Sequence, residues 1–457
     1  MILNVASPKL RSGLDWAFIA GLVFSLVLAG KIVPFLVVVG VVPVPFLLGI
    51  IRQRPLVVSP ARIVGPAALY FGYALLTYFF YTGLQPGEAK PVNPDLELYG
   101  IALVMLIVGL LRSLEIEGLR RKFDVTVPWA LLAAFVVLSV LMFAGYRNGC
   151  RLTAAAASPF IPALLFGTLT FLSFLGWRGL SARERNIRLM LNAFAVVVIL
   201  AYTGSRGIAV AQAGVLLIFA ILALVPQCRG AVPGFRQLLV SSLAGVALCA
   251  AVSVITGCGS MDRIMPMIKT IGILSAHAEE QPTQAAPAAA TPQAPASPVV
   301  AQPVAPPPPA AGTDKAIMDT DISIGFRLEM WRTSLHAIAE APIFGHGALY
   351  LQHLITERYG FEHNHNQYLS WLVTGGIVGL CFGLMFLAIP WFVSAGLQFP
   401  DRLVVTLAVS IFWGLAMMFD SYFNLKFYTH YYCLLCGLLY ALVNDTLVSE
   451  RHSEGKT

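Results

Sequence analysis

The stretch TVPWALLAAFVVLSVLMFAG, residues 126–145, carries no charged side chain. A helix needs about 20 apolar residues to cross the hydrocarbon of a bilayer. Similar apolar runs recur along all 457 residues, of which 58% are hydrophobic and 12% charged, whereas a soluble domain carries about 25% charged residues. This composition excludes a soluble globule and the disordered, collagen-like and disulfide-scaffold classes. It predicts an all-α polytopic membrane protein.

Apolar windows of sufficient length predict about twelve transmembrane helices. Helices one to nine are expected within 1–256, followed by a long loop at 257–366, helices ten to twelve within 367–446 and a tail at 447–457. The expected spans are 15–30, 32–50, 62–82, 98–111, 126–145, 158–176, 189–204, 207–225, 237–256, 367–394, 403–419 and 427–446.

The positions of Lys and Arg predict the orientation, because cytoplasmic loops retain positive charge. Basic connections follow the second, fourth, sixth and eighth expected spans, whereas the 83–97 loop is net acidic. Both termini are therefore expected in the cytoplasm, as an even number of spans requires. These loops account for the net charge of +7, so we expect no nucleic-acid partner.

Three arginines break this pattern. Arg147 and Arg151 follow the fifth span and Arg206 follows the seventh, all on the expected external side. Such charges either mark a site for an anionic ligand or extend to lipid headgroups.

The external loop at 257–366 divides into two parts. Residues 281–312 are mostly Ala and Pro with no charge, which indicates an extended, tolerated insertion; a spacer or a recognition segment is the alternative. Residues 325–347 predict an amphipathic helix that presents Arg327 and Trp331 on one face and ends at Pro342 and a glycine turn.

Histidines gather at the end of this loop, in His363-Asn364-His365-Asn366. A zinc site is one interpretation of His363 and His365, but Glu362 is the only acidic residue close to them in sequence. A general base is a second interpretation, because imidazole titrates near neutral pH. Ordinary hydrogen bonding at a headgroup boundary is the third.

Other polar residues and cysteines allow weaker interpretations. Asp420 and Lys426 lie at the external end between the last two spans, as an ion pair or as part of the same polar patch, and a structural role is favoured. Cys150 and Cys258 could pair in an oxidising compartment. The C-x-x-C of Cys433 and Cys436 lies in an apolar span and is expected in the core. No nucleotide-binding or nucleophile-elbow motif occurs in a suitable context.

Several short motifs follow one another along the chain, namely Ser205-Arg206-Gly207, Gly325/Arg327/Trp331, Pro342/Gly345/Gly347, His365/Asn366/Leu369 and Gly376/Gly379/Leu380. Their order and spacing resemble the O-antigen ligase and polymerase superfamily over roughly 200–380. The predicted layout is also similar, with cytoplasmic termini and a long periplasmic loop before the last three helices. The Ala/Pro-rich insertion departs from the compact loop of that family.

Members of that superfamily are integral membrane glycosyltransferases that pass a glycan from undecaprenyl diphosphate to an acceptor sugar without nucleotide or metal. The resemblance implies that Arg206 and Arg327 hold the diphosphate and that His365 activates the acceptor hydroxyl, with His363 as a second catalytic candidate. Supporting roles are expected for Arg147, Trp331 and Asn366. No cofactor or metal is expected.

The expected function is transfer of O-antigen polysaccharide from undecaprenyl diphosphate to lipid A-core oligosaccharide, by inversion, at the periplasmic face of the bacterial inner membrane. The expected partners are the lipid-linked glycan, the lipid A-core or growing glycan acceptor, and membrane lipids. A polysaccharide polymerase acting on lipid-linked repeat units is the main alternative. A transporter, which often shows repeated halves, and a non-catalytic envelope scaffold are rivals from other classes.

Overall fold

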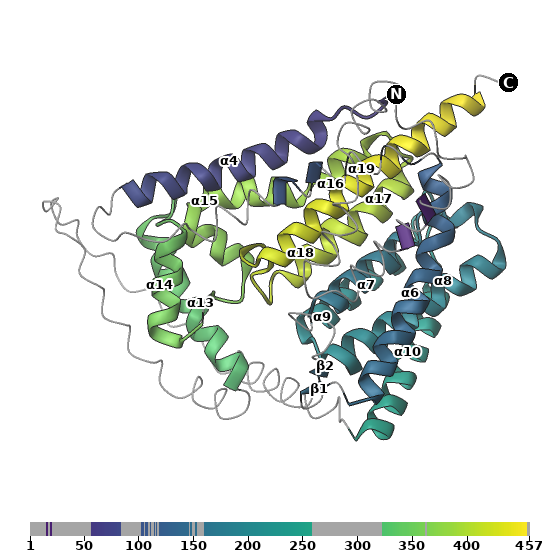
Figure 1. Ribbon diagram of the computed structural model, residues 1–457, viewed down its shortest axis with the longest axis horizontal. Helices are drawn as coiled ribbons and strands as arrows, with labels where there is room; N and C mark the ends of the chain where they lie inside the picture. Colours follow the sequence, from purple (N-terminus) through teal and green to yellow (C-terminus); the bar gives the residue numbers. More distant parts are fainter. Residues whose placement is uncertain are drawn as a thin grey trace, which may run out of the picture.

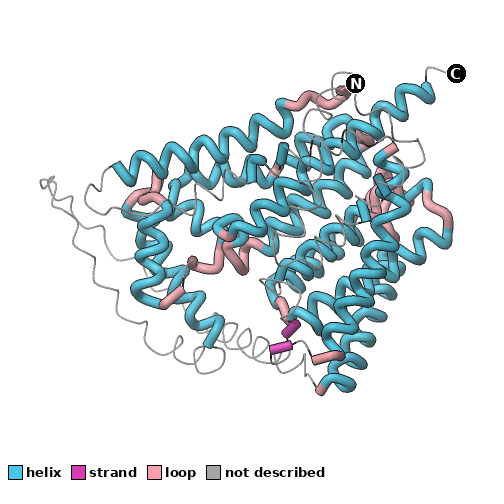
Figure 2. The backbone as a smooth tube through the Cα atoms, in the orientation of Figure 1, coloured by secondary structure: helices cyan, strands magenta, loops and turns pink. Residues whose placement is uncertain are grey.

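The computed structural model describes residues 56–83, 118–145, 147–148, 151–152, 160–257, 322–361 and 363–454, with scattered positions before 118. Figures 1 and 2 show that these residues are almost entirely helical. The only strands among them are β1 (Arg147–Asn148) and β2 (Arg151–Leu152), which pair as a short antiparallel hairpin. The chain is therefore the all-α polytopic membrane protein that its composition predicts.

The helices of the first half are α4 (Ala61–Gly83), α6 (Leu119–Phe143), α7 (Phe160–Leu172), η1 (Trp177–Gly179), α8 (Ala182–Val197), the π-helical η2 (Val198–Thr203), α9 (Arg206–Leu222) and α10 (Phe235–Thr256). Those of the second half are α13 (Ile322–Glu340), α14 (Ala348–Tyr359), α15 (Gln367–Leu387), α16 (Ile389–Val393), η3 (Ser394–Gly396), α17 (Phe399–Thr406), the π-helical η4 (Leu407–Ile411), α18 (Phe412–Ala416), η5 (Tyr422–Asn424) and α19 (Lys426–Glu454).

Six described helical segments are long and apolar enough to cross a membrane, namely Leu119–Phe143, Ala182–Thr203, Phe235–Thr256, Gln367–Leu387, Phe399–Ala416 and Phe427–His452. The helices α7 and α9 are shorter but also apolar. Each of these coincides with an expected span. The expected spans at 15–30, 32–50 and 98–111 lie largely outside the described residues, so the total of about twelve stays a prediction.

Close helix packing places the membrane helices in one bundle, with α8 beside α10, α9 beside α18 and α4 alongside α15 (Figure 1). A Cβ at Gly245 would lie 2.7 Å from the Ala193 carbonyl oxygen, so glycine lets α10 approach α8. Asn192 then donates hydrogen bonds from α8 to Ser241 and Ser242. These bonds satisfy the buried amide where no water is available.

The expected span at 367–394 is wrong as a continuous helix. It breaks inside α15 at Gly376, whose φ is 59° and ψ −157°, and a second helix, α16, begins after Ala388. The Pro342–Gly347 turn fills the break: the His346 and Gly347 N–H groups donate to Val373 and Thr374 carbonyls. The Ile377 N–H donates to the Pro342 carbonyl. Protein partners thus satisfy backbone groups that the break releases.

The loop at 257–366 is more helical than the sequence indicates. The amphipathic helix predicted after residue 325 is confirmed as α13, but α14 was not predicted. Buried Met330 and Ala337 of α13 pack with Leu351 and Ile355 of α14 in a small apolar cluster that also includes Val373 of α15. This cluster attaches the two helices to the start of α15, just beside the histidine segment.

Candidate active site

The His363–Asn366 segment connects α14 to α15, and its last residue begins the next helix. The Asn366 Oδ1 accepts hydrogen bonds from the Tyr368 and Leu369 N–H groups at 3.0 and 3.1 Å, which is the N-cap that α15 requires. The Asn366 amide also donates to the Met418 carbonyl. Asn366 thus caps α15 and fixes this segment against the turn after α18, while its supporting role in a reaction stays a prediction.

Asn364 is the buried anchor of the segment, with none of its surface exposed. Its amide donates to Ser334 of α13, and its Oδ1 accepts from the hydroxyls of Ser370 in α15 and Ser421 before η5. The Trp331 indole donates to the Asn364 carbonyl at 2.9 Å. One residue therefore joins three chain segments, and Trp331 is bonded to its carbonyl.

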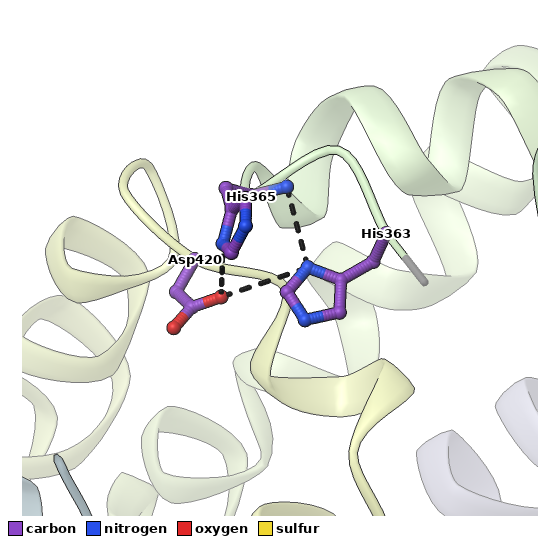
Figure 3. A group of neighbouring side chains, drawn as sticks. All are labelled: His363, His365 and Asp420. Carbon is purple, nitrogen blue, oxygen red and sulfur yellow. Dashed lines mark hydrogen bonds and ion pairs between the residues drawn. The ribbon is translucent and has the colours of Figure 1, made fainter. Parts of the chain in front are cut away.

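His365 and Asp420 form a hydrogen-bonded pair, although 54 residues separate them in sequence (Figure 3). The His365 Nδ1 lies 3.2 Å from the Asp420 Oδ1. A carboxylate is only an acceptor, so Nδ1 carries a proton, and in the neutral imidazole Nε2 then keeps its lone pair. Within the described part of the chain Nε2 takes no hydrogen bond, and 20% of the His365 side chain is exposed. The pair can therefore take up a proton at Nε2.

The backbone of His365 is strained. Its φ is 53°, and no other described non-glycine residue has a positive φ. A side chain in this left-handed region costs about 1–2 kcal/mol per residue. Such strain persists where the surroundings hold it and is frequent at active sites.

His363 completes the cluster (Figure 3). Its Nδ1 accepts the His365 backbone N–H at 3.4 Å and lies 3.7 Å from the Asp420 Oδ1. Burial lowers the pKa of His363 to about 4, against the opposing effect of Asp420, with smaller contributions in the same direction from His365 and Arg327. His363 is therefore neutral near neutral pH.

Asp420 is charged although it is buried. Burial alone would raise its pKa, but the hydrogen bond from His365, the histidine charges and the Ser421 N–H together hold the pKa of Asp420 below its ordinary value. A charged acceptor strengthens the bond that orients His365.

Both expected diphosphate-binding arginines lie on elements that adjoin this cluster. Arg327 of α13 is near enough for its charge to act on His363 and Tyr422, and no ion pair of Arg327 is seen among the described residues. Arg206 is the first residue of α9, whose N-terminus is capped by Ser205. Gly207 packs against Phe419, since a Cβ there would lie 2.5 Å from that side chain. The turn carrying Asp420 thus meets the α9 N-terminus, which favours anions.

Other expectations have mixed outcomes. In sequence, Glu362 is the only acidic residue close to the two histidines. In the structure Asp420 lies against both of them, because the turn after α18 folds back onto the segment before α15. The Arg147 backbone pairs in the β1–β2 hairpin, but its side chain, like that of Lys426, lies outside the described residues. Cys150 and Cys258 also lie outside them. Cys433 and Cys436 are core residues as expected.

Sequence reasoning missed Asn364, Ser334 and Ser421 as members of the site. The useful signal is topological: two expected spans, 367–394 and 403–419, separate the histidine segment from Asp420 and Ser421, and an even number of crossings returns the chain to the same membrane face. The sequence favours a structural role for Asp420 over a second polar patch lining the same cavity, whereas in the structure Asp420 lies against His365 and His363.

The cluster also has the spacing of a metal site. Ligand atoms of His363, His365 and Asp420 all lie within 4.8 Å of one another, and two imidazoles with a carboxylate suit zinc or iron. In this structure, however, the nearest approaches are hydrogen bonds: Nδ1 of His365 donates to Asp420 and Nδ1 of His363 accepts an N–H. The donor set is suitable for a metal, but the directions of these hydrogen bonds favour proton transfer.

The fold and site define a polytopic helical membrane protein with a buried Asp–His pair and arginine-bearing elements at one end of its helices. Compared with known protein families, residues 191–384, which are less than half of the chain, match the family described as O-Antigen ligase. The matched region includes Arg206, Arg327 and His365. One curated relative, an uncharacterized protein of Haemophilus influenzae, is 35% identical over 80 residues, which is 15% of this chain and 20% of the relative. The match thus spans about a fifth of that relative's length.

Proposed function

We propose that this protein transfers O-antigen polysaccharide from undecaprenyl diphosphate to lipid A-core oligosaccharide at the periplasmic face of the bacterial inner membrane. The match of residues 191–384 to the O-antigen ligase family supports this class of reaction. The observation that carries the proposal is the hydrogen bond between His365 and Asp420, which leaves Nε2 as an acceptor beside elements that carry two arginines. Such a site would combine a general base with two arginines for binding a diphosphate.

In the proposed reaction, Nε2 of His365 takes the proton of the acceptor hydroxyl while its oxygen attacks the anomeric carbon. The new C–O bond forms as the bond from that carbon to the diphosphate oxygen breaks, so the configuration inverts. The bonding electrons leave with undecaprenyl diphosphate. A general base contributes about 10²–10⁴-fold to such a step.

Arginine suits the leaving-group end of this reaction. Negative charge grows on the diphosphate as the glycosidic bond breaks, so fixed guanidinium groups stabilise the transition state more than the ground state. Arg206 and Arg327 are the residues we assign to this role. A guanidinium stays protonated and binds phosphate oxygens in pairs, which lysine cannot do.

The test uses cells that lack this protein, complemented with wild type, His365→Ala, Arg327→Ala or Arg206→Ala at equal membrane levels. Lipopolysaccharide and carrier-linked glycan are then resolved by gel. We expect long glycan stranded on the lipid carrier and bare lipid A-core in all three variants. His353→Ala is the matched control, since His353 is exposed on α14 and pairs only with Glu357 among the described residues.

Two other outcomes would redirect the proposal. Lipopolysaccharide with single repeats, or loss of a secreted polysaccharide with normal lipopolysaccharide, would identify a polymerase using the same chemistry. Full complementation by all three variants would overturn the catalytic assignment and favour a scaffold.

A further inference from the structure

His363 has an unusual place in the cluster because its ring meets the backbone of His365 rather than that residue's side-chain nitrogen. The His365 N–H points at the His363 Nδ1 (Figure 3). His365 is also the described non-glycine residue with left-handed backbone. The contact therefore acts on the one peptide of the site whose conformation is strained.

The neighbours of His365 are held from other directions. Asn364 is fixed by Ser334, Ser370 and Ser421, and the Asn366 N–H donates to both the Asn364 Oδ1 and the Ser421 hydroxyl. These bonds fix the peptides on each side. The intervening peptide is held at both of its polar ends, since the Trp331 indole donates to the Asn364 carbonyl and the His365 N–H donates to His363, so His363 is the partner that fixes the N–H end.

The same hydrogen bond defines the tautomer of His363. Since Nδ1 accepts an N–H, its lone pair is engaged and the ring proton resides on Nε2. In that state Nε2 cannot take a proton from a hydroxyl. His363 is therefore unsuited to be the base, and His365, whose Nδ1 donates to Asp420, is suited to it.

We propose that His363 is a positioning residue: its Nδ1 holds the His365 backbone in the left-handed conformation and thereby keeps Nε2 of His365 aimed at the acceptor hydroxyl. This inference rests on the proposed function. It gives a separate role to His363, which the resemblance leaves as a second catalytic candidate. The property that His363 must supply is then a hydrogen-bond acceptor at the position of Nδ1, and the basicity of the ring is not required.

Three substitutions distinguish this role from the alternatives. His363→Asn places its Oδ1 at the position of Nδ1 and so keeps the hydrogen-bond acceptor there. His363→Gln places its acceptor near the position of Nε2 instead. His363→Ala has no side-chain acceptor. A general base or a metal ligand would be lost in all three, because an amide neither takes up a proton near neutral pH nor binds zinc well.

The experiment measures kcat and KM for glycan transfer by each full-length protein, purified in lipid discs, from undecaprenyl-diphosphate-linked glycan to its acceptor. We expect His363→Asn to keep kcat within about threefold of wild type, and His363→Ala and His363→Gln to lose about tenfold or more with little change in KM. Melting temperature in the same discs verifies that each variant is folded.

Inactivity of His363→Asn equal to that of His363→Ala would overturn the inference, as would full activity of His363→Gln or His363→Ala. Restoration of His363→Ala by added zinc would overturn it in favour of a metal site. His365→Ala separates the two claims: if it is active, the proposed function fails, and if it is inactive while the His363 variants behave alike, only the present inference fails.

Discussion

Replacement of Asp420 by Asn tests the charge that orients His365. The Asn side chain has the shape of Asp, and its Oδ1 can still accept from both the His365 Nδ1 and the Ser421 N–H, which share this oxygen in the wild type. The substitution therefore removes the charge and leaves the geometry. Asp420→Ala removes both.

The expected magnitude follows from the kind of bond. A hydrogen bond to a charged group contributes about 1.5–3 kcal/mol and a neutral one about 1 kcal/mol. Asp420 is 8% exposed, so solvent screens the charge little. The difference is about 0.5–2 kcal/mol, so we expect Asp420→Asn to lower kcat by about 2- to 30-fold, since 1.4 kcal/mol is tenfold. Asp420→Ala leaves His365 unoriented, and its loss should approach the about 10²–10⁴-fold worth of a general base.

The assay is the transfer reaction in lipid discs, with kcat and KM measured separately. Asp401→Asn is the matched control, because Asp401 of α17 accepts the Gly176 N–H at a distance from this cluster. Wild-type kcat in both Asp420 variants would refute the reasoning. Equal and complete inactivity of the two would show that geometry is lost even with Asn, and that the charge was not the quantity tested.

Four further predictions concern Arg327, Gly376, the pKa of His363 and the effect of metal removal. Arg327→Lys should keep part of the activity lost in Arg327→Ala, because charge remains while paired contacts to phosphate are lost, and the ratio of the two kcat values measures this. Gly376→Ala should lower folded protein in membranes, since its Cβ would lie 2.2 Å from the Ile343 backbone at a φ of 59°, whereas Gly72→Ala, with open space around it, should not. Because burial lowers the pKa of His363 from 6.5 to about 4, the unfolded chain takes up that proton first as pH falls; the melting temperature should therefore fall from pH 6.5 towards 4, and less so in His363→Asn. Prolonged EDTA treatment should leave transfer unchanged, and loss that zinc restores would instead identify the histidine cluster as a metal site.

The sequence predicts the membrane helices well because an uncharged run of 20 residues has few alternatives in a bilayer. It also identifies His365, Arg206 and Arg327 through spacing and membrane side. The break at Gly376 is less accessible to such reasoning, since glycines are frequent in membrane helices and only the partner turn shows which one has a positive φ.

Some residues of the site were not predicted from the sequence for a similar reason. Asp420 and Asn364 act through contacts between segments more than 50 residues apart, and local pattern carries no record of such contacts. The left-handed backbone of His365 is likewise not predicted from sequence, because histidine is enriched in that conformation but only a minority of histidines adopt it.

The seating of the Pro342–Gly347 turn in the break of α15 has a consequence for engineering this protein. The two parts exchange hydrogen bonds in both directions, so neither is a separable module. A chimera that replaces only the residues before α15 would bring a foreign turn to a helix break shaped for the native one. Grafts between relatives should therefore move the segment from α13 through the end of α15 as a single piece.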